Sequence, residues 1–208
     1  MAQTLKPEVR ERLLAAAAAT FARAGYEGAR LADIAAEAGV STGNVYRYFH
    51  DKDALFAEVV PRATVARLLL LRSRIRELRG RSDWGTATVG GSDRADALLE
   101  FWIEHRLAIV IALGHAQGSP LAYVRPLVEA QLMRISTHQL TVQGRSLPPT
   151  ERLVLDRLFA STVDMIVHIL ASHSEPVAIR RAFAVFWRFQ LAGLQALFAP
   201  LLASPNGS

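Results

Sequence analysis

The residues best equipped for chemistry lie between positions 41 and 52, and they suit hydrogen bonding and charge pairing with a polyanion. Thr42 and Asn44 can hydrogen-bond base edges or phosphate, and the missing side chain at Gly43 would permit close approach. The next side chains along the sequence are of types that commonly contact phosphate, and they belong to Tyr46, Arg47, Tyr48 and Lys52. The spacing therefore predicts a nucleic-acid contact surface at the start of a short helix.

Two short helices joined by a tight turn would have to position these side chains. Apolar spacing predicts one helix at about 31–38 and a second at about 42–49. Gly39 can supply the positive φ that the turn needs, Val40 can fill the space between the helices, and Ser41 can cap the second helix. This pattern is typical of a helix-turn-helix, whose second helix enters the major groove by its N-terminal end.

Many positions in the first quarter of the chain match one known pattern in order. They are Arg12-Leu13-Leu14, Ala16-Ala17, Phe21, Gly25-Tyr26, Ala32-Asp33-Ile34-Ala35, Ala38-Gly39-Val40-Ser41, Gly43, Tyr46, Tyr48-Phe49, Lys52 and Leu55. On these residues the chain closely resembles the TetR family of transcriptional regulators. The resemblance implies a three-helix DNA-binding domain, a variable helical ligand domain, and a homodimer that represses transcription and leaves DNA when a small molecule binds.

The resemblance also implies roles for individual residues. By position, the residues against bases would be Thr42, Gly43 and Asn44, and those holding phosphates would be Ser41, Tyr46, Tyr48 and Lys52. Arg47 occupies a position that often contacts DNA. Either tyrosine could instead be a core aromatic, although Val45 and Phe49 already fill the inward face. We therefore expect at least one tyrosine to be exposed.

The chain departs from the family pattern before its second helix. The family usually has Thr or Ser there, whose hydroxyl caps the helix and touches phosphate, whereas this chain has Ala29 and Arg30. Loss of such a cap costs about 1 kcal/mol. Arg30 could restore a phosphate contact through its charge, or it could be a solvated arginine.

Helical periodicity continues to the C-terminus and predicts an all-α fold of about nine helices. We expect them at 7–24, 31–38, 42–49, 51–79, 93–113, a short segment from Ser119-Pro120, 126–144, 150–172 and 176–199. Pro61 should kink or interrupt the fourth, and glycines predict a flexible loop at 80–92. We divide the chain into a helix-turn-helix domain, 1–50, and a helical ligand-binding and dimerisation domain, 51–208.

The last two predicted helices are apolar nearly all round, so both sides of each need a cover. A second copy of the chain could bury the remaining apolar faces of both helices. The pattern therefore predicts a two-fold dimer built on a four-helix bundle. The residues expected at this interface are Leu158, Met165, Ile169, Phe183, Phe186 and Leu194. Such a dimer would place its recognition helices about 34–36 Å apart, on a palindromic operator.

A small-molecule site is expected among the helices after residue 92. His105 lies within an apolar stripe at 93–113, and a polar group among aromatic side chains can fix the orientation of a ligand. The candidate lining residues are Phe101, Trp102, His105, Tyr123, Met133, His138, Phe159, Met165 and Trp187. Residues of these types in such places are more often ordinary core residues than ligand contacts, and the ligand's identity stays open.

Composition narrows the function classes. The net charge of +5 is concentrated in residues 1–80, which hold 13 Lys and Arg against nine Asp and Glu, as suits a polyanionic partner. The absence of cysteine excludes disulfides and thiolate metal sites and is compatible with a reducing cytoplasm. We expect no signal peptide, no membrane span, no cofactor and no metal, because the early charges, the broken uncharged stretches and the histidine spacing fit none of them.

Several alternatives remain open beside the ligand-released repressor. The chain could be an activator, a regulator without an effector, or a module that uses its helix-turn-helix to bind protein. It could also be a helical-bundle enzyme or small-molecule-binding protein that no longer reads DNA, although no enzyme motif is visible. Pro61 could act as a pivot between the domains or be a static kink; an unchanged spacing of recognition helices upon ligand binding would contradict the pivot.

Overall fold

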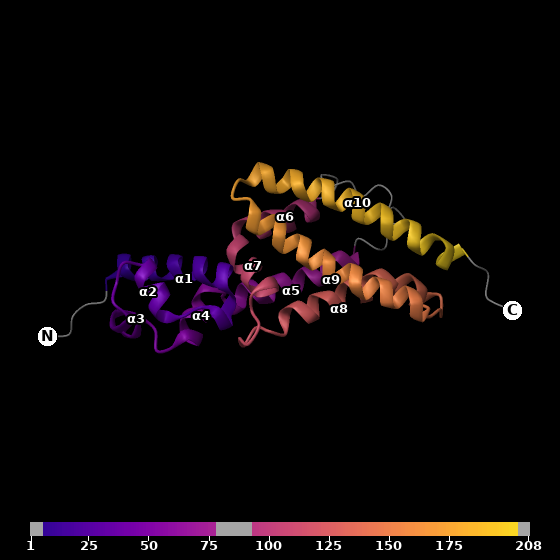
Figure 1. The fold of residues 1–208 in the computed structure, drawn as a ribbon. Coiled ribbons are helices and arrows are strands. Elements are labelled where there is room, and N and C mark those ends of the chain that lie inside the picture. The colour runs from indigo at the N-terminus through magenta and orange to yellow at the C-terminus, as the bar shows by residue number, and fades with distance from the viewer. Residues whose placement is uncertain (1–5, 78–92, 204–208) are drawn as a thin grey trace. The chain divides into compact units, whose positions relative to one another are not determined.

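The computed structural model describes residues 6–77 and 93–203, and there the chain forms ten α-helices and no strand (Figure 1). This confirms the predicted all-α fold. The loop expected at 80–92 lies outside the described residues. The helices are α1 (Pro7–Gly28), α2 (Leu31–Glu37), α3 (Thr42–Tyr48), α4 (Lys52–Val59), α5 (Arg62–Glu77), α6 (Asp93–Glu104), α7 (Arg106–Gly114), α8 (Val124–Val142), α9 (Pro149–Ser172) and α10 (Pro176–Ala203).

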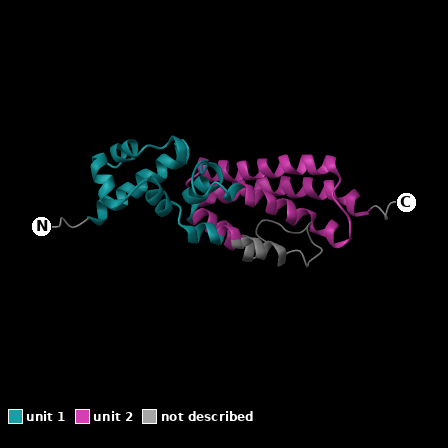
Figure 2. Cartoon of the chain, turned by 90° about the horizontal axis from the view of Figure 1, so that it is seen from below, with its two compact units in different colours: residues 1–67, 105–125 teal, residues 68–104, 126–208 magenta. Residues whose placement is uncertain are grey.

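Contacts divide the chain into two compact units, coloured separately in Figure 2. Unit 1 comprises residues 1–67 and 105–125, and unit 2 comprises residues 68–104 and 126–208. Unit 1 is thus larger than the 1–50 segment predicted as the DNA-binding domain, because α4 and α7 both pack against α1. Packing does not test where the functional boundary lies, so that division remains a prediction.

The first helix forms the spine of unit 1. Pro7 occupies its first turn, and Leu13, Ala17 and Phe21 are completely buried along one side. Gly25 then adopts a φ of 72°, which interrupts the helix where the sequence predicts its end. The next amide, that of Tyr26, donates to the His115 carbonyl at 2.8 Å and ties the end of α1 to the segment after α7.

Two of the predicted helices are each divided in the structure. Pro61 separates α4 from α5, as its lack of an N–H predicts. The single helix expected at 93–113 is wrong, because His105 leaves helical geometry at φ −105° and ψ 27° and α7 starts afresh after it. No local breaker marks His105 in the sequence. The five residues 109–113 are all buried, and α7 packs against α1, so tertiary contacts select this break.

The short helix predicted from Ser119-Pro120 is also wrong. Turns occupy residues 117–123, and the Ser119 hydroxyl supports them by donating to the Ala116 carbonyl at 2.7 Å and accepting from the Leu121 amide at 3.1 Å. Serine commonly competes with helix formation through such local hydrogen bonds. The next helix begins at Val124, with Pro126 in its first turn.

Unit 2 is held together where α10 packs against α9 and α6. Trp102 of α6 and Phe183 of α10 lie with ring centroids 5.3 Å apart, and both side chains are buried. An ion pair joins Arg180 to Glu100 at the surface. Farther along α10, Gln190 Nε2 donates to Thr162 Oγ1 at 2.9 Å, and this hydrogen bond joins α10 to α9.

The packing of α10 is incomplete, because apolar side chains from its first turn onward are uncovered. Val177, Val185 and Phe189 are 78%, 59% and 78% exposed. By length and composition α10 is the one described helix that could cross a membrane, with a mean hydropathy of 1.3 over its most apolar 18 residues, 11% of them buried. Such a test is weak evidence, since any long apolar helix that another surface covers would pass it.

Candidate nucleic-acid interface

The turn between α2 and α3 has the geometry that the sequence predicts. Gly39 adopts a φ of 67°, and the Val40 amide donates back to the Ala35 carbonyl at 2.9 Å. The Ser41 side chain caps α3 by accepting from the Asn44 amide at 3.3 Å. The turn is therefore closed by hydrogen bonds at both ends, and the start of α3 is fixed relative to α2.

The inner and outer faces of α3 differ sharply. Val45 is completely buried and Phe49 nearly so, which anchors the helix. On the other face Thr42 and Gly43 are exposed and Asn44 is half-buried. A Cβ added at Gly43 would meet no atom within 4 Å, so the protein's own packing does not require glycine there. An external surface that approaches the backbone closely would require it.

The remaining predicted contact residues of α3 diverge in their surroundings. Tyr46 is 57% exposed, as expected for at least one of the two tyrosines, and Arg47 is exposed as well. The Tyr48 side chain is half-buried, and its hydroxyl lies against the chain that precedes α1. It accepts from the Lys6 amide at 3.0 Å and donates to the Lys6 carbonyl at 3.3 Å.

Lys52 is engaged inside unit 1. Its Nζ donates to the Tyr26 carbonyl at 2.8 Å and the Ala29 carbonyl at 3.3 Å, and it lies 4.2 Å from the centre of the Tyr26 ring. These carbonyls belong to the end of α1, where a cation is favourable. The ammonium thereby fastens α4 to α1, and a phosphate contact would have to use its remaining N–H.

Tyr26 completes this junction, which sequence reasoning missed. Its hydroxyl donates to Asp53, and its ring packs edge-on against Phe56 at 5.0 Å. Burial, followed by the neighbouring Asp53 carboxylate, raises the pKa of Tyr26 to about 12. Asp51 in turn caps α4 by accepting from the Ala54 amide at 2.7 Å, and that bond holds the pKa of Asp51 below its ordinary value. Only the folded chain brings Tyr26 to Asp53 and Phe56, whereas the Asp51 cap is local and an Asp just before a helix could have predicted it.

The start of α2 agrees with the departure from the family pattern. Arg30 is the N-cap residue, it is exposed, and no side chain caps the helix. Glu37 at the other end of α2 accepts from Thr20 Oγ1 at 3.0 Å and Arg23 Nη2 at 3.1 Å. The helix is thus held mainly from its C-terminal end and by buried Ile34 and Ala35.

The residues predicted to line a ligand pocket are distributed over both compact units. His105 and Tyr123 belong to unit 1, and the other seven belong to unit 2. Tyr123 is 53% exposed and His138 is also exposed, whereas Phe101 and Phe159 are buried core residues. Trp102 is the predicted pocket residue with a buried polar atom to offer a ligand. Its Nε1 has no hydrogen-bond partner among the described residues.

The residues predicted at the dimer interface divide in the same way. Leu158 and Met165 are 38% and 40% exposed, and Phe186 and Leu194 are half-buried. Ile169 and Phe183 are buried within their own subunit, although Ile169 lines the open groove between α9 and α10. For Phe183 the reason is its contact with Trp102, which the sequence did not reveal.

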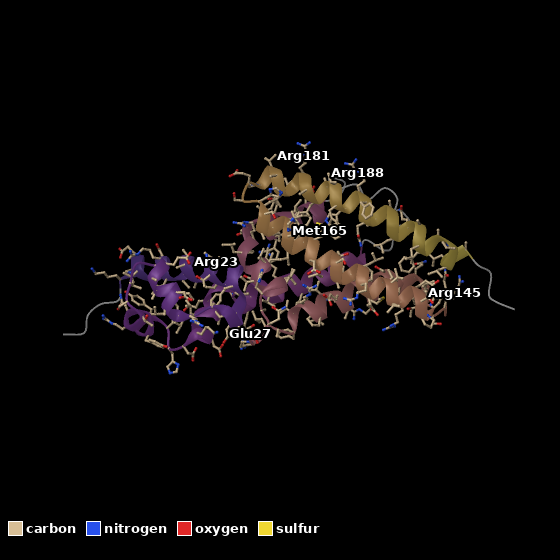
Figure 3. All side chains as sticks on the ribbon, in the orientation of Figure 1. Arg23, Glu27, Arg145, Met165, Arg181 and Arg188 are labelled. Atoms are coloured by element: carbon tan, nitrogen blue, oxygen red, sulfur yellow. The ribbon has the colours of Figure 1, made fainter. Side chains whose placement is uncertain are left out.

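An open apolar groove of about 650 Å³ runs along α9 and α10. Met165, Phe186 and Phe189 contribute apolar surface, and His168 and Arg181 contribute polar groups. In Figure 3 Arg181 and Arg188 point outward from α10, and Met165 lies on α9. Among the described residues no cluster of three or more His, Asp or Glu side chains could hold a metal ion.

The fold and this site define a helical protein with a helix-turn-helix whose second helix is anchored inside and polar outside. Residues 13–59 match the family described as "Bacterial regulatory proteins, tetR family". The chain therefore carries the helix-turn-helix domain of the TetR family of transcriptional regulators, and the resemblance predicted from sequence is confirmed. This assignment covers α2, α3 and α4 in full and most of α1.

Known proteins are similar to this chain over the same region or, at low identity, over more of its length. An uncharacterised HTH-type transcriptional regulator of Bacillus subtilis (strain 168), YdgC, is 42% identical over 53 residues, which are 26% of this chain and 27% of that protein. A tetR-family transcriptional regulator from Streptomyces coelicolor is 21% identical, with 95% of this chain and 85% of that one covered and a TM-score of 0.45. A TerR/AcrR-family regulator from Aquifex aeolicus VF5 is 15% identical, with 91% and 99% covered and a TM-score of 0.44.

Proposed function

We propose that this protein is a non-enzymatic, cytoplasmic transcriptional regulator that binds double-stranded DNA as a homodimer. The observation that carries the proposal is the outer face of α3. Thr42 and Gly43 are exposed, Gly43 has open space where a side chain would be, and Ser41 fixes the helix start. A backbone that must approach base edges closely would use such a surface.

A titration of duplex DNA at several salt concentrations tests this proposal. Each phosphate contact should add about 0.9 to the slope of log affinity against log salt, so binding through α3 and its surroundings predicts a steep fall. A protein-interaction module or a small-molecule-binding protein would show no such dependence. Folded protein that lacks salt-dependent DNA affinity would contradict the proposal.

The dimer is proposed to form through α9 and α10. Leu153 and Leu158 of α9 and Val177, Val185 and Phe189 of α10 are exposed apolar side chains that water would otherwise surround. A second copy of the same face would cover them and form a four-helix bundle. Two-fold symmetry then implies a palindromic operator.

Release from DNA by a small molecule is also part of the proposed function. It is supported by Trp102, because a buried N–H without a partner is costly and a ligand acceptor would satisfy it. The effector would then be a largely apolar molecule with one hydrogen-bond acceptor beside the Trp102–Phe183 pair.

A screen of such compounds for release of bound DNA tests the effector. Trp102→Phe keeps most of the ring and removes the N–H, so it should weaken the response at least about fivefold, in keeping with about 1 kcal/mol for a lost hydrogen bond. Gln139→Glu, on the exposed surface of α8 and outside the predicted pocket, is the control. An equal response in both variants would remove Trp102 from the site, and a compound that strengthens DNA binding would contradict release.

A further inference from the structure

Lys6, directly before α1, is held against the recognition helix by one hydroxyl. Tyr48 comes from the last turn of α3, and its hydroxyl contacts both main-chain polar groups of Lys6. Lys6 is the N-cap residue of α1 and has no side-chain cap of its own. The tyrosine therefore takes the place of the acidic side chain that often binds the N-cap amide of a helix.

Neighbouring contacts fix the same end of α1. Arg10 forms an ion pair with Glu58 of α4, and its guanidinium lies 5.8 Å from the centre of the Phe49 ring, directly after α3. The first turn of α1 thus contacts Tyr48 and Phe49 on the C-terminal side of α3 and Glu58 of α4. Lys6, exposed and cationic, is held on the same unit as the exposed residues of α3.

We propose that Lys6 is a phosphate-contacting residue and that Tyr48 is a positioning residue that acts through it. This proposal rests on the proposed DNA-binding function. It changes the role of Tyr48, which the sequence resemblance predicts to contact phosphate directly. A hydroxyl that already accepts one hydrogen bond and donates another has little capacity left for phosphate. The Lys6 main chain is held at the C-terminal end of α3, and its exposed side chain carries the charge that phosphate binding uses.

The slope of log affinity against log salt separates the two roles. Loss of a cationic contact releases fewer counterions and should lower the slope by about one per bound subunit, whereas loss of a neutral hydroxyl contact should leave it unchanged. The experiment compares the full chain with Lys6→Gln, Tyr48→Phe and the double variant on one duplex. Arg134→Gln, which removes an exposed charge of α8 in unit 2, is the matched control.

The proposal predicts that Lys6→Gln and Tyr48→Phe each lower the slope and weaken binding about three- to tenfold. The double variant should be no weaker than Lys6→Gln alone, and Arg134→Gln should bind like the wild type. An unchanged slope in Lys6→Gln would overturn the phosphate contact. A weaker Tyr48→Phe with an unchanged slope and additive effects would return Tyr48 to a direct contact.

Two controls keep the outcomes distinct. Thermal unfolding of each variant checks the fold, and if Tyr48→Phe does not fold, the Lys6→Gln slope alone decides whether Lys6 contacts phosphate. Wild-type protein without any salt-dependent DNA affinity would contradict the proposed function itself. Wild-type binding with a normal Lys6→Gln slope would contradict only this inference.

Discussion

At the scale of single residues, the outer face of α3 is the proposed DNA-contact surface, and its inner face packs into the core of unit 1. Ser41 lies on both, because its hydroxyl caps the helix and stays exposed at the predicted contact surface. Gly43 is the opposite case, since nothing in the subunit depends on it. Variants at Gly43 therefore separate DNA binding from stability.

Gly43→Ala should stabilise the fold and weaken DNA binding. Alanine is better than glycine in a helix by about 0.8–1.0 kcal/mol, and the added methyl group meets no protein atom. DNA affinity should fall at least about tenfold, or 1.4 kcal/mol, because the methyl group would meet the DNA. Thermal unfolding and a binding titration measure both effects.

Gly193→Ala is the matched control for this change. Gly193 lies in α10, on the same face as Phe189 of the proposed dimer interface, and a Cβ added there meets nothing within 4 Å in its own subunit. The control should gain similar stability and keep its DNA affinity at concentrations where the protein is dimeric. Full affinity in Gly43→Ala would mean that the backbone of α3 does not approach DNA closely.

Asn44→Ala should change which sequence is preferred, whereas Tyr46→Ala should weaken binding to all sequences alike. The reason is that an amide can pair with a base edge, and the exposed Tyr46 hydroxyl is suited to phosphate. Competition between duplexes that differ at single base pairs measures both effects. An Asn44→Ala variant with unchanged preference would show that its side chain does not read bases.

At the scale of elements, the short helices depend on polar contacts to α1. Glu37 accepts from Arg23 and Thr20, and these bonds hold the pKa of Glu37 below its ordinary value of 4.5. A carboxylate with a lowered pKa in the folded state stabilises the fold above its unfolded pKa. That contribution is lost as the pH falls through the folded value.

Glu37→Gln should therefore reduce the dependence of stability on acid. The wild type should lose unfolding free energy more steeply than the variant as the pH falls below about 4.5. Urea unfolding at pH 7 and at successive acidic values gives the comparison. Parallel curves for the two proteins would show that the carboxylate contributes no pH-dependent stability to the α1–α2 contact.

Local sequence rules predicted the helix-turn-helix well, because its determinants are local. Gly39 needs a positive φ, Ser41 needs an amide three residues on, and Pro61 lacks an N–H. The break at His105 could not be predicted, since it depends on α7 packing against α1. The Lys52 contacts and the burial of Phe183 escaped prediction for the same reason.

At the scale of the whole molecule, the exposed apolar side chains of α9 and α10 are the main unexplained surface of one subunit. Phe189→Glu should weaken the proposed dimer by at least about tenfold, or 1.4 kcal/mol, because a carboxylate would be buried without a partner. Gln139→Glu, on the exposed surface of α8, is the matched control. Sedimentation over a range of protein concentrations measures the change.

Other outcomes would assign this surface differently. A Phe189→Glu variant that remains as dimeric as the control would place the interface elsewhere. A wild type that is monomeric and binds phospholipid vesicles would make α10 a membrane-contacting helix, in line with its length and apolar composition. Either result would remove the proposed link between dimer symmetry and a palindromic operator.

Selection of binding sites from a random duplex pool tests the central claim most directly. If two copies of α3 read DNA about 34–36 Å apart, the purified protein should enrich a palindrome whose half-sites are one helical turn apart. Gly43→Ala, selected in parallel, should enrich it far less. Failure of folded, dimeric wild-type protein to enrich any sequence would contradict sequence-specific reading by α3.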